Sequence, residues 1–253
     1  MPMQSLRDWH QRFLQQAAWT RQARHFVAAA LHFDAADRIL DVGCGSGVLF
    51  QELSEQSSAR LHGLDIDRQS LRLAQELFVN SALVCGDAFR LPYRAASFDI
   101  TLCHFLLLWL PDPAAGLAEM ARVTRPGGYV CILAEPDYGA RIDYPPQFER
   151  LGKLQAEALG EQGADPLIGR KLLALLIGAG LESIHVTLIG GHWSGPPHAV
   201  DWSLEWSVIA ADLRDRLSAA ELDDLRQQDK LAWNSGERLL YVPTFYAWGR
   251  KRN

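Results

Sequence analysis

The sequence has few of the features that mark secreted and membrane proteins. Only four cysteines occur in 253 residues, and none of them belongs to a CxxC pair. The N-terminal "MPMQSLRDWHQRF" lacks the apolar core of a signal peptide, and no apolar run approaches the roughly 20 residues that cross a bilayer. Cysteines in or just after apolar strand-like runs predict reduced, buried thiols in a cytoplasmic protein. They are Cys44, Cys85, Cys103 and Cys131.

Basic clusters, internal repeats and low-complexity linkers are also missing. The net charge is −5, and the short "GRKRN" at the C-terminus is interpreted as a solvated tail. This balance weighs against a nucleic-acid partner, and no tight carboxylate group has the spacing of a metal site. With 48% hydrophobic and 22% charged residues, the chain can build a full core. One domain over residues 1–253 is the simplest organisation.

The chain does contain a regular alternation of strand-like and helical segments. Helical stretches start near Val48, Asp67 and Asp112, and another follows Asp165-Pro166. This alternation predicts an α/β fold, with a doubly wound, mostly parallel seven-stranded sheet, an antiparallel last strand and helices on both faces. The expected strands cover residues 38–43, 60–66, 81–87, 98–105, 129–136, 183–191 and 239–250, with a helix-ending turn at 125–128.

Three segments fall outside this alternation. Residues 1–33 have the pattern of an amphipathic helix, which we expect to form a lid. Residues 193–235 hold four of the eight tryptophans, which we expect mainly to pack a helical cap. Residues 136–164 also lie on the substrate side, and the prolines and glycine of "AEPDYGARIDYPPQFERLG" predict a shaped loop and not a helix. Cap segments over the C-terminal edge of the sheet fit the place where open α/β sheets bind ligands.

A glycine-rich loop follows the first predicted strand. Gly43, Gly45 and Gly47 give the spacing G-x-G-x-G, whereas the dinucleotide fingerprint is G-x-G-x-x-G. Glycine lets a backbone approach a ligand closely and adopt positive φ. The N–H groups at the start of the following helix then face the ligand. The loop therefore indicates a nucleotide-like ligand without deciding which one.

Polar side chains end the four neighbouring strands. Asp41 ends the first strand and Asp65 the second, where a carboxylate can accept hydrogen bonds from ribose hydroxyls. Asp87 ends the third strand and could accept from the exocyclic amine of a base, and His104 follows the fourth strand. Because strand ends at one edge of a parallel sheet are adjacent, these side chains are expected to share one site.

The order of these pieces resembles the class I S-adenosylmethionine (SAM)-dependent methyltransferases of small-molecule type. The matching pieces are "DVGCGSG", "GLDID", "GDAFRLPYRAASFD" and "HFLLLWLPDPAAGLAEMARVTRPGG". The resemblance is tight over residues 35–135, the expected SAM-binding core. It implies SAM as cofactor, S-adenosylhomocysteine (SAH) as product, and in-line transfer of a methyl group to a small-molecule acceptor. No metal is expected.

The resemblance also implies a set of cofactor contacts. Asp41 would hold the amino group of SAM, Gly43 and Gly45 would pass beneath its methionine part, and Asp65 would bind its ribose. The side chains beside the adenine would include Ile66. The whole implied set is Asp41, Gly43, Cys44, Gly45, Gly47, Asp65, Ile66, Asp87, Ala88, Phe89 and His104.

The base and the acceptor site are less well specified. An O–H or N–H acceptor must lose its proton, and the sequence does not rank the possible bases. Trp19 and Arg24 are possible lid contacts, and the "DPPY" or "NPPY" signature of nucleic-acid methyltransferases is absent. The candidate bases are His104, Glu135, Asp137, Tyr138 and His192. The candidate acceptor contacts are Tyr138, Arg141 and Trp193.

Two other functions remain open from the sequence. An NAD(P)-dependent oxidoreductase is favoured by the glycine loop and by Asp65, although the glycine spacing counts against it. A non-catalytic SAM-binding protein would have the same cofactor residues. Turnover with a methyl acceptor would separate it from an enzyme.

Overall fold

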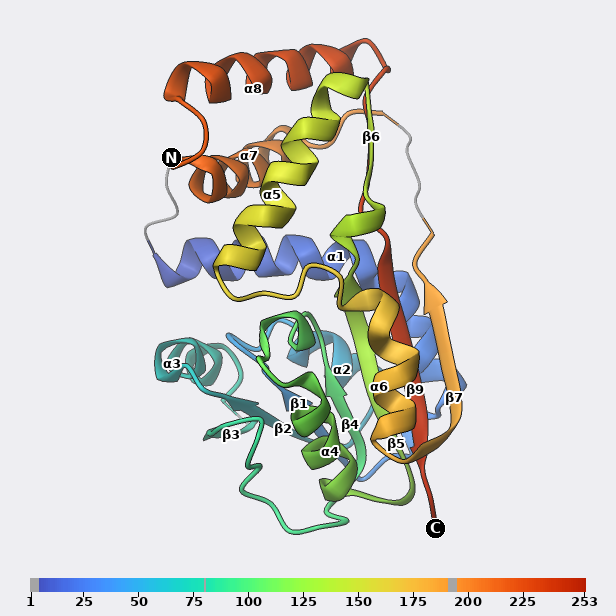
Figure 1. Cartoon of the computed structure of the whole chain (residues 1–253). Helices are drawn as coiled ribbons and strands as arrows, with labels where there is room; N and C mark the ends of the chain where they lie inside the picture. Colours follow the sequence, from blue (N-terminus) through green and yellow to red (C-terminus); the bar gives the residue numbers. More distant parts are fainter. Residues whose placement is uncertain (1–4, 80, 191–194) are drawn as a thin grey trace.

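A seven-stranded sheet forms the centre of the protein in the computed structural model, which describes residues 5–79, 81–190 and 195–253 (Figure 1). The strand order is β3-β2-β1-β4-β5-β9-β7. The first five strands are parallel, and β9 is antiparallel to both of its neighbours. The predicted sheet is therefore confirmed. Its strands are β1 (Arg38–Val42), β2 (Arg60–Asp65), β3 (Ala82–Cys85), β4 (Phe98–Cys103), β5 (Thr124–Pro136), β7 (Leu181–Leu188) and β9 (Thr244–Lys251).

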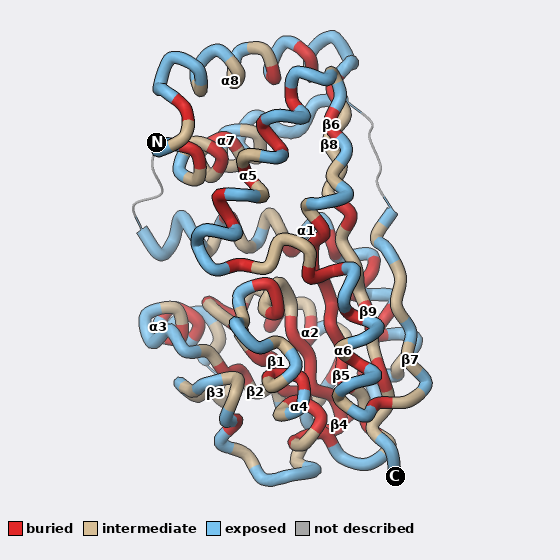
Figure 2. Tube along the Cα trace, in the orientation of Figure 1, coloured by how far each residue is buried: buried red, intermediate tan, exposed pale blue. Residues whose placement is uncertain are grey.

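Helices cover both faces of this sheet. Alternate residues of β1 point to opposite faces, so Leu40 packs in the cluster that contains α4 and α6, and Ile39 packs in the cluster that contains α1. Figure 2 shows the buried residues concentrated along the central strands. The helices are α1 (Leu6–Ala30), α2 (Phe50–Gln56), α3 (Arg68–Leu77), α4 (Pro113–Val123), α5 (Glu149–Glu161), α6 (Leu172–Gly178), α7 (Ala199–Leu213) and α8 (Ala219–Asn234).

Side-chain caps set the starts of the helices that flank the site. The Asp67 carboxylate accepts hydrogen bonds from the backbone N–H groups of Gln69 and Ser70 at the start of α3. Asp112 caps α4 in the same way, and Pro113 occupies the first helical position, as the sequence predicts.

Several expected elements differ from the structure. The turn expected at 125–128 lies within β5, where the pairing with β4 is irregular. Residues 239–250 form two strands, β8 (Leu239–Tyr241) and β9, because Pro243 lacks the N–H that a continuous strand would donate. Residues 136–164 include β6 (Ile142–Tyr144), which pairs with β8, and the helix α5, so the expectation of a loop was wrong there.

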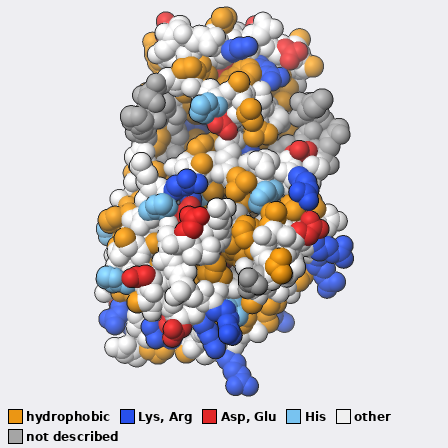
Figure 3. All heavy atoms as spheres, turned by 180° about the vertical axis from the view of Figure 1, so that it is seen from behind, with side chains coloured by type: hydrophobic (Ala, Val, Ile, Leu, Met, Phe, Trp, Pro, Cys, Tyr) orange, Lys and Arg blue, Asp and Glu red, His pale blue; other side chains and the backbone are white. Residues whose placement is uncertain are grey.

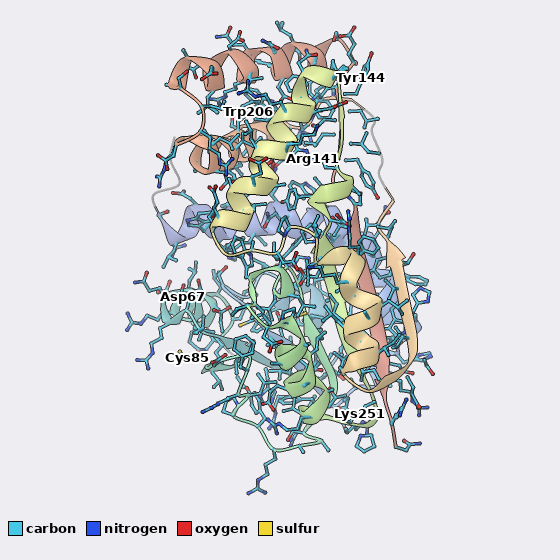
Figure 4. The ribbon with its side chains drawn as sticks, in the orientation of Figure 1. Asp67, Cys85, Arg141, Tyr144, Trp206 and Lys251 are labelled. Carbon is cyan, nitrogen blue, oxygen red and sulfur yellow. The ribbon has the colours of Figure 1, made fainter. Side chains whose placement is uncertain are left out.

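The helices α5, α7 and α8 form a cap above the C-terminal edge of the sheet, and α1 runs across at the level between cap and sheet (Figure 1). The cap has its own apolar cluster, which includes Phe148 of the turn before α5 and Trp206 of α7. Figure 4 places Trp206 inside the cap and Arg141 at its base. The tryptophan Trp206 is buried, as expected for packing.

A chain of buried charges also ties the cap together. Arg238 donates to Asp143 at 2.8 Å and to Asp229 at 2.7 Å, and all three side chains are almost fully buried. Asp229 accepts from the indole N–H groups of Trp202 and Trp206 at 2.7 and 2.8 Å. Each of these charges therefore has an opposite charge beside it, which burial requires.

Candidate cofactor site

Four neighbouring strand ends bring the predicted cofactor residues together. In the sheet, β1 lies between β4 and β2, and β3 lies beyond β2. Asp41 pairs in register with Gly63 of β2 and Leu102 of β4. His104, Asp41, Asp65 and Asp87 therefore lie at consecutive strand ends on one edge. This edge is where open parallel sheets bind ligands.

The glycine loop leaves β1 along this edge. Gly43, Gly45 and Gly47 all have positive φ, which explains why glycine occupies these positions. The N–H groups of Gly43 and Cys44 donate to the Leu64 carbonyl at 2.7 and 3.0 Å, which ties the loop to β2. A Cβ placed on Gly45 would meet no atom within 4 Å, so this part of the backbone has open space beside it.

The Asp41 carboxylate is the most unusual group of the site. It is 3% exposed, and no hydrogen bond from another described residue reaches its side chain. Burial raises the pKa of Asp41 well above its usual value, the nearby Asp65 raises it further, and Arg24 lowers it. A buried carboxylate without a donor is stabilised by any ligand that offers a cationic group.

Asp65 connects the end of β2 to the glycine loop and to α3. Its two carboxylate oxygens accept from the N–H groups of Gly45 at 2.7 Å and Asp67 at 2.8 Å. Each oxygen keeps a further acceptor position for a ribose hydroxyl. Ile66 is 75% exposed beside it, an apolar surface available to a flat ring.

The third strand end is more open. Asp87 is exposed and accepts from the N–H of Phe89 at 2.9 Å. Cys85 is exposed at the end of β3, so the expectation that every cysteine is buried was wrong for this one. Figure 4 shows Cys85 and Asp67 at this edge, on the side of the sheet away from β7.

His104 connects the sheet edge to α1. Its Nε2 lies 2.9 Å from the Thr20 hydroxyl and 3.4 Å from Nη1 of Arg24. Burial, and to a smaller extent the Arg24 charge, lower the pKa of His104 well below its usual value, so the ring is neutral at pH 7. Arg24 also forms a bidentate ion pair with Glu52 of α2, at 2.9 and 2.5 Å.

Helix α1 thus lies over the site through three polar contacts. Besides Thr20 and Arg24, His10 contributes its Nδ1, which lies 2.8 Å from the Ser46 hydroxyl in the glycine loop. Trp19, in contrast, is 53% exposed, with the Arg12 guanidinium stacked on its ring. Figure 3 shows hydrophobic side chains exposed across the middle of the rear face, where α1 lies.

Two of the candidate bases are occupied by the protein itself. Glu135 is fully buried and accepts from three backbone N–H groups of residues 106–108. Burial raises the pKa of Glu135 to about 8, although those three donors act to lower it. Asp137 accepts from Gly139 and forms a bidentate ion pair with Arg170 at 2.5 and 2.7 Å. Both side chains therefore accept hydrogen bonds from donors of the protein itself.

Of the predicted acceptor contacts, one is engaged by other side chains of the protein and one is not. Arg141 donates to Asp143 at 2.6 and 3.2 Å and to Gln155 at 2.7 Å, which occupies its guanidinium inside the cap. Tyr138 follows β5, and no hydrogen bond from another described residue reaches its hydroxyl. Trp193 and His192 lie outside the described residues.

The sequence reasoning missed the polar residues of α1 that face the site. Thr20 and Arg12 are both nearly buried, at 2% and 4% exposure. The helix also carries exposed tryptophans, so its sequence has no clear apolar stripe. Without such a stripe, the face that packs on the sheet could not be identified. The available signal was the position of Thr20 one helical turn from Arg24, the residue that the sequence did suggest.

The surface hollows of the protein lie away from this site. Two hollows of about 410 and 420 Å³ lie elsewhere, one lined by residues such as Arg122 and Lys251 and one by residues such as His25 and His32. Neither includes a predicted cofactor residue. Within the described ranges, no three His, Cys, Asp or Glu side chains are placed to share a metal ion. No helix there is long and apolar enough to traverse a bilayer.

Comparison with known proteins identifies the family. A methyltransferase domain family matches residues 40–132. An uncharacterized methyltransferase of Schizosaccharomyces pombe is 36% identical over 166 residues, which are 59% of this chain and 59% of the relative. The demethylmenaquinone methyltransferase of Oceanobacillus iheyensis is 34% identical over 176 residues, which are 62% of this chain and 74% of the relative. The chain belongs to the class I SAM-dependent methyltransferase family.

A solved structure supports the fold. Phosphoethanolamine N-methyltransferase 2 of Haemonchus contortus, in complex with SAM, aligns with a TM-score of 0.58 and 15% identity, over 92% of this chain and 53% of that chain. The chain spans 59%, 51% and 40% of the length of the first three curated relatives that it matches.

The residues of the site fit SAM. Asp41 is a buried acid that accepts no side-chain hydrogen bond from the described residues, Gly45 has open space beside its backbone, and Asp65 has acceptor positions at the next strand end. A nicotinamide dinucleotide has no ammonium group for Asp41, and the glycine spacing is also wrong for it.

Proposed function

We propose that this protein transfers the methyl group of SAM to a small-molecule acceptor. The observation that carries the proposal is the row of strand-end side chains at one sheet edge, which includes Asp41, a buried acid that accepts no side-chain hydrogen bond from the residues the structure describes. The methyltransferases among its relatives, including the demethylmenaquinone enzymes, support a small acceptor. The four free cysteines support a location in the cytoplasm.

The chain's contribution to catalysis is to hold and shield the reactants. SAM, when bound, supplies a methyl group on a positively charged sulfur. Asp41 would bind its ammonium group, Asp65 its ribose hydroxyls, and the glycine loop would lie against its chain. Helix α1 would exclude water through its contacts with His104 and Ser46. Alignment of the reacting groups can account for up to about 7–11 kcal/mol of such a barrier in well-oriented cases.

The acceptor is proposed to lie between the sheet edge and the cap, where polar side chains of three elements meet. Arg12 of α1 forms a 2.6 Å ion pair with Glu205 of α7, and Asp212 lies on the same side of α7 two turns later. The charges of Arg12, Glu205 and Asp212 all affect the pKa of Tyr138. Burial is the main cause that raises the pKa of Tyr138 to about 12, so its hydroxyl is a donor at neutral pH and not a base.

Labelled SAM and a panel of small metabolites would test the proposal. We expect calorimetry to detect SAM and SAH binding but no tight NAD binding, and at least one small molecule to gain label. Tyr138→Phe should raise the KM for that acceptor and leave SAH affinity unchanged, with the exposed Tyr144→Phe as the matched control. Label in RNA, DNA or protein alone would contradict the small acceptor. SAH binding without turnover on any acceptor would favour a non-catalytic SAM-binding protein.

A further inference from the structure

We propose that Glu135 is a positioning residue that fixes the 104–108 turn, the segment that links the sheet to both the glycine loop and α1. The inference rests on the proposed function only in naming SAH as the ligand whose affinity reports this geometry.

Glu135 holds the turn through three hydrogen bonds. Its Oε1 accepts from the N–H groups of Leu106 at 2.9 Å and Leu107 at 2.7 Å, and its Oε2 accepts from Leu108 at 3.2 Å. The side chain is 0% exposed at the end of β5, directly beside β4. The preceding residue reinforces this arrangement, because the Ala134 carbonyl accepts from the N–H of Phe105 at 2.9 Å.

The turn needs such a partner because of its conformation. Phe105 has φ of +53°, a left-handed conformation that non-glycine residues rarely adopt. The turn runs into a short 3-10 helix, Leu107–Trp109, whose first N–H groups have no partner in the helix itself. Leu107 and Leu108 are buried, so water does not satisfy those donors. The two side-chain oxygens of Glu135 accept from all three amides at once.

The same turn contacts two parts of the cofactor site, helix α1 and the glycine loop. His104, at its start, contacts Thr20 of α1 at 2.9 Å. Leu106 packs so closely on the glycine loop that a Cβ on Gly43 would lie 2.7 Å from its Cδ1. A displacement of the turn would therefore move both the lid contact and the loop beneath the ligand. Glu135 touches neither directly, so its effect passes through the turn.

Glu135→Gln is the informative variant, because it keeps the shape of the side chain and replaces one acceptor oxygen by a donor. We expect SAH affinity measured by calorimetry to fall about tenfold or more, because one of the atoms that accepts from the 106–108 amides becomes an NH2 group that can only donate. The amides of residues 106–108 should exchange hydrogen faster in the protein alone, and the NMR signals of the His104 ring should shift. Glu135→Ala should show the larger changes, with Gln restoring part of the loss.

Asp99→Asn provides the matched control. Asp99 is also a nearly buried carboxylate that accepts from two backbone N–H groups, those of Asp37 and Arg38 at 3.0 and 2.7 Å, but at the opposite edge of the sheet. It should lower the melting temperature without changing SAH affinity or the His104 signals.

The outcomes separate the inference from the proposed function. A folded Glu135→Gln variant with wild-type SAH affinity and wild-type exchange at 106–108 would overturn the positioning role. Failure of both variants to fold would also contradict it, since Glu135 would then support the whole fold. A wild-type protein that binds no SAH contradicts the proposed function, and the exchange and His104 measurements still test Glu135.

Discussion

The Nε2 of His104 lies 2.9 Å from the hydroxyl of Thr20, so the turn after β4 and the N-terminal helix meet at the centre of the cofactor edge. Thr20 also contacts Arg24, which reaches Glu52 on α2. The contact gives α1 a fixed position over the site. It also keeps the Nε2 of His104 engaged with the protein itself.

Thr20→Val should loosen this closure. The substitution keeps the shape of the side chain but removes the hydroxyl that contacts His104 and Arg24, and the loss of even one neutral hydrogen bond costs about 0.5–1.5 kcal/mol. We expect SAH affinity, measured by calorimetry, to fall roughly two- to tenfold, which corresponds to that free energy. Thr101→Val is the control, because Thr101 bonds to Thr124 at 2.7 Å inside the sheet. An equal loss of affinity in both variants would show that Thr20 has no special role at the site.

Asp41→Asn should stabilise the free protein while weakening ligand binding. Burial makes the ionised carboxylate costly in the absence of a ligand, and an amide avoids that cost. The ammonium group of SAM or SAH would lose a charged partner worth about 1.5–3 kcal/mol. We therefore expect a higher melting temperature without ligand and a clear loss of SAH affinity. A lower melting temperature with unchanged affinity would mean that Asp41 is a structural residue.

The same carboxylate predicts how binding depends on pH. The folded pKa of Asp41 is raised, so its contribution to folding is present below the unfolded value of 3.8 and is lost as pH rises through the folded value. A bound ammonium group favours the ionised form and lowers that pKa. SAH affinity should therefore increase as pH rises toward the raised pKa of Asp41 in the free protein, and level off above it. Calorimetry across this range should show the slope in the wild type and a flatter curve in Asp41→Asn.

Much of this site was predictable from the sequence because it is local. The positions of Asp41, Asp65 and the glycines follow from strand ends, and parallel strands bring such ends together without further information. The role of Glu135 was not predictable, because its partners are distant in the chain. The role of Arg141 was not predictable, because the segment around it was interpreted as a loop. Hydrogen bonds to backbone N–H groups leave no residue pattern at all, so Glu135 resembled a free acid.

The N-terminal helix shows the same limit. Its amphipathic pattern predicted only a lid over the site. In the structure Val27 is fully buried against the cluster that includes Ile39 and Leu133. Removal of residues 1–30 would therefore expose the core, and single substitutions such as Thr20→Val test the lid better.

The cap should depend on its buried charges. Asp229→Ala removes one partner of Arg238 and the only oxygen that accepts from both Trp202 and Trp206 among the described residues. Loss of one member of a buried ion pair costs about 3–5 kcal/mol, a large part of the roughly 5–15 kcal/mol that stabilises a domain. Urea unfolding followed by tryptophan fluorescence should show this loss, whereas Asp215→Ala, which breaks an exposed pair with Arg214, should leave the midpoint unchanged. Equal midpoints for the two variants would mean that apolar packing alone holds the cap, and that Asp229 only fills space between α7 and α8.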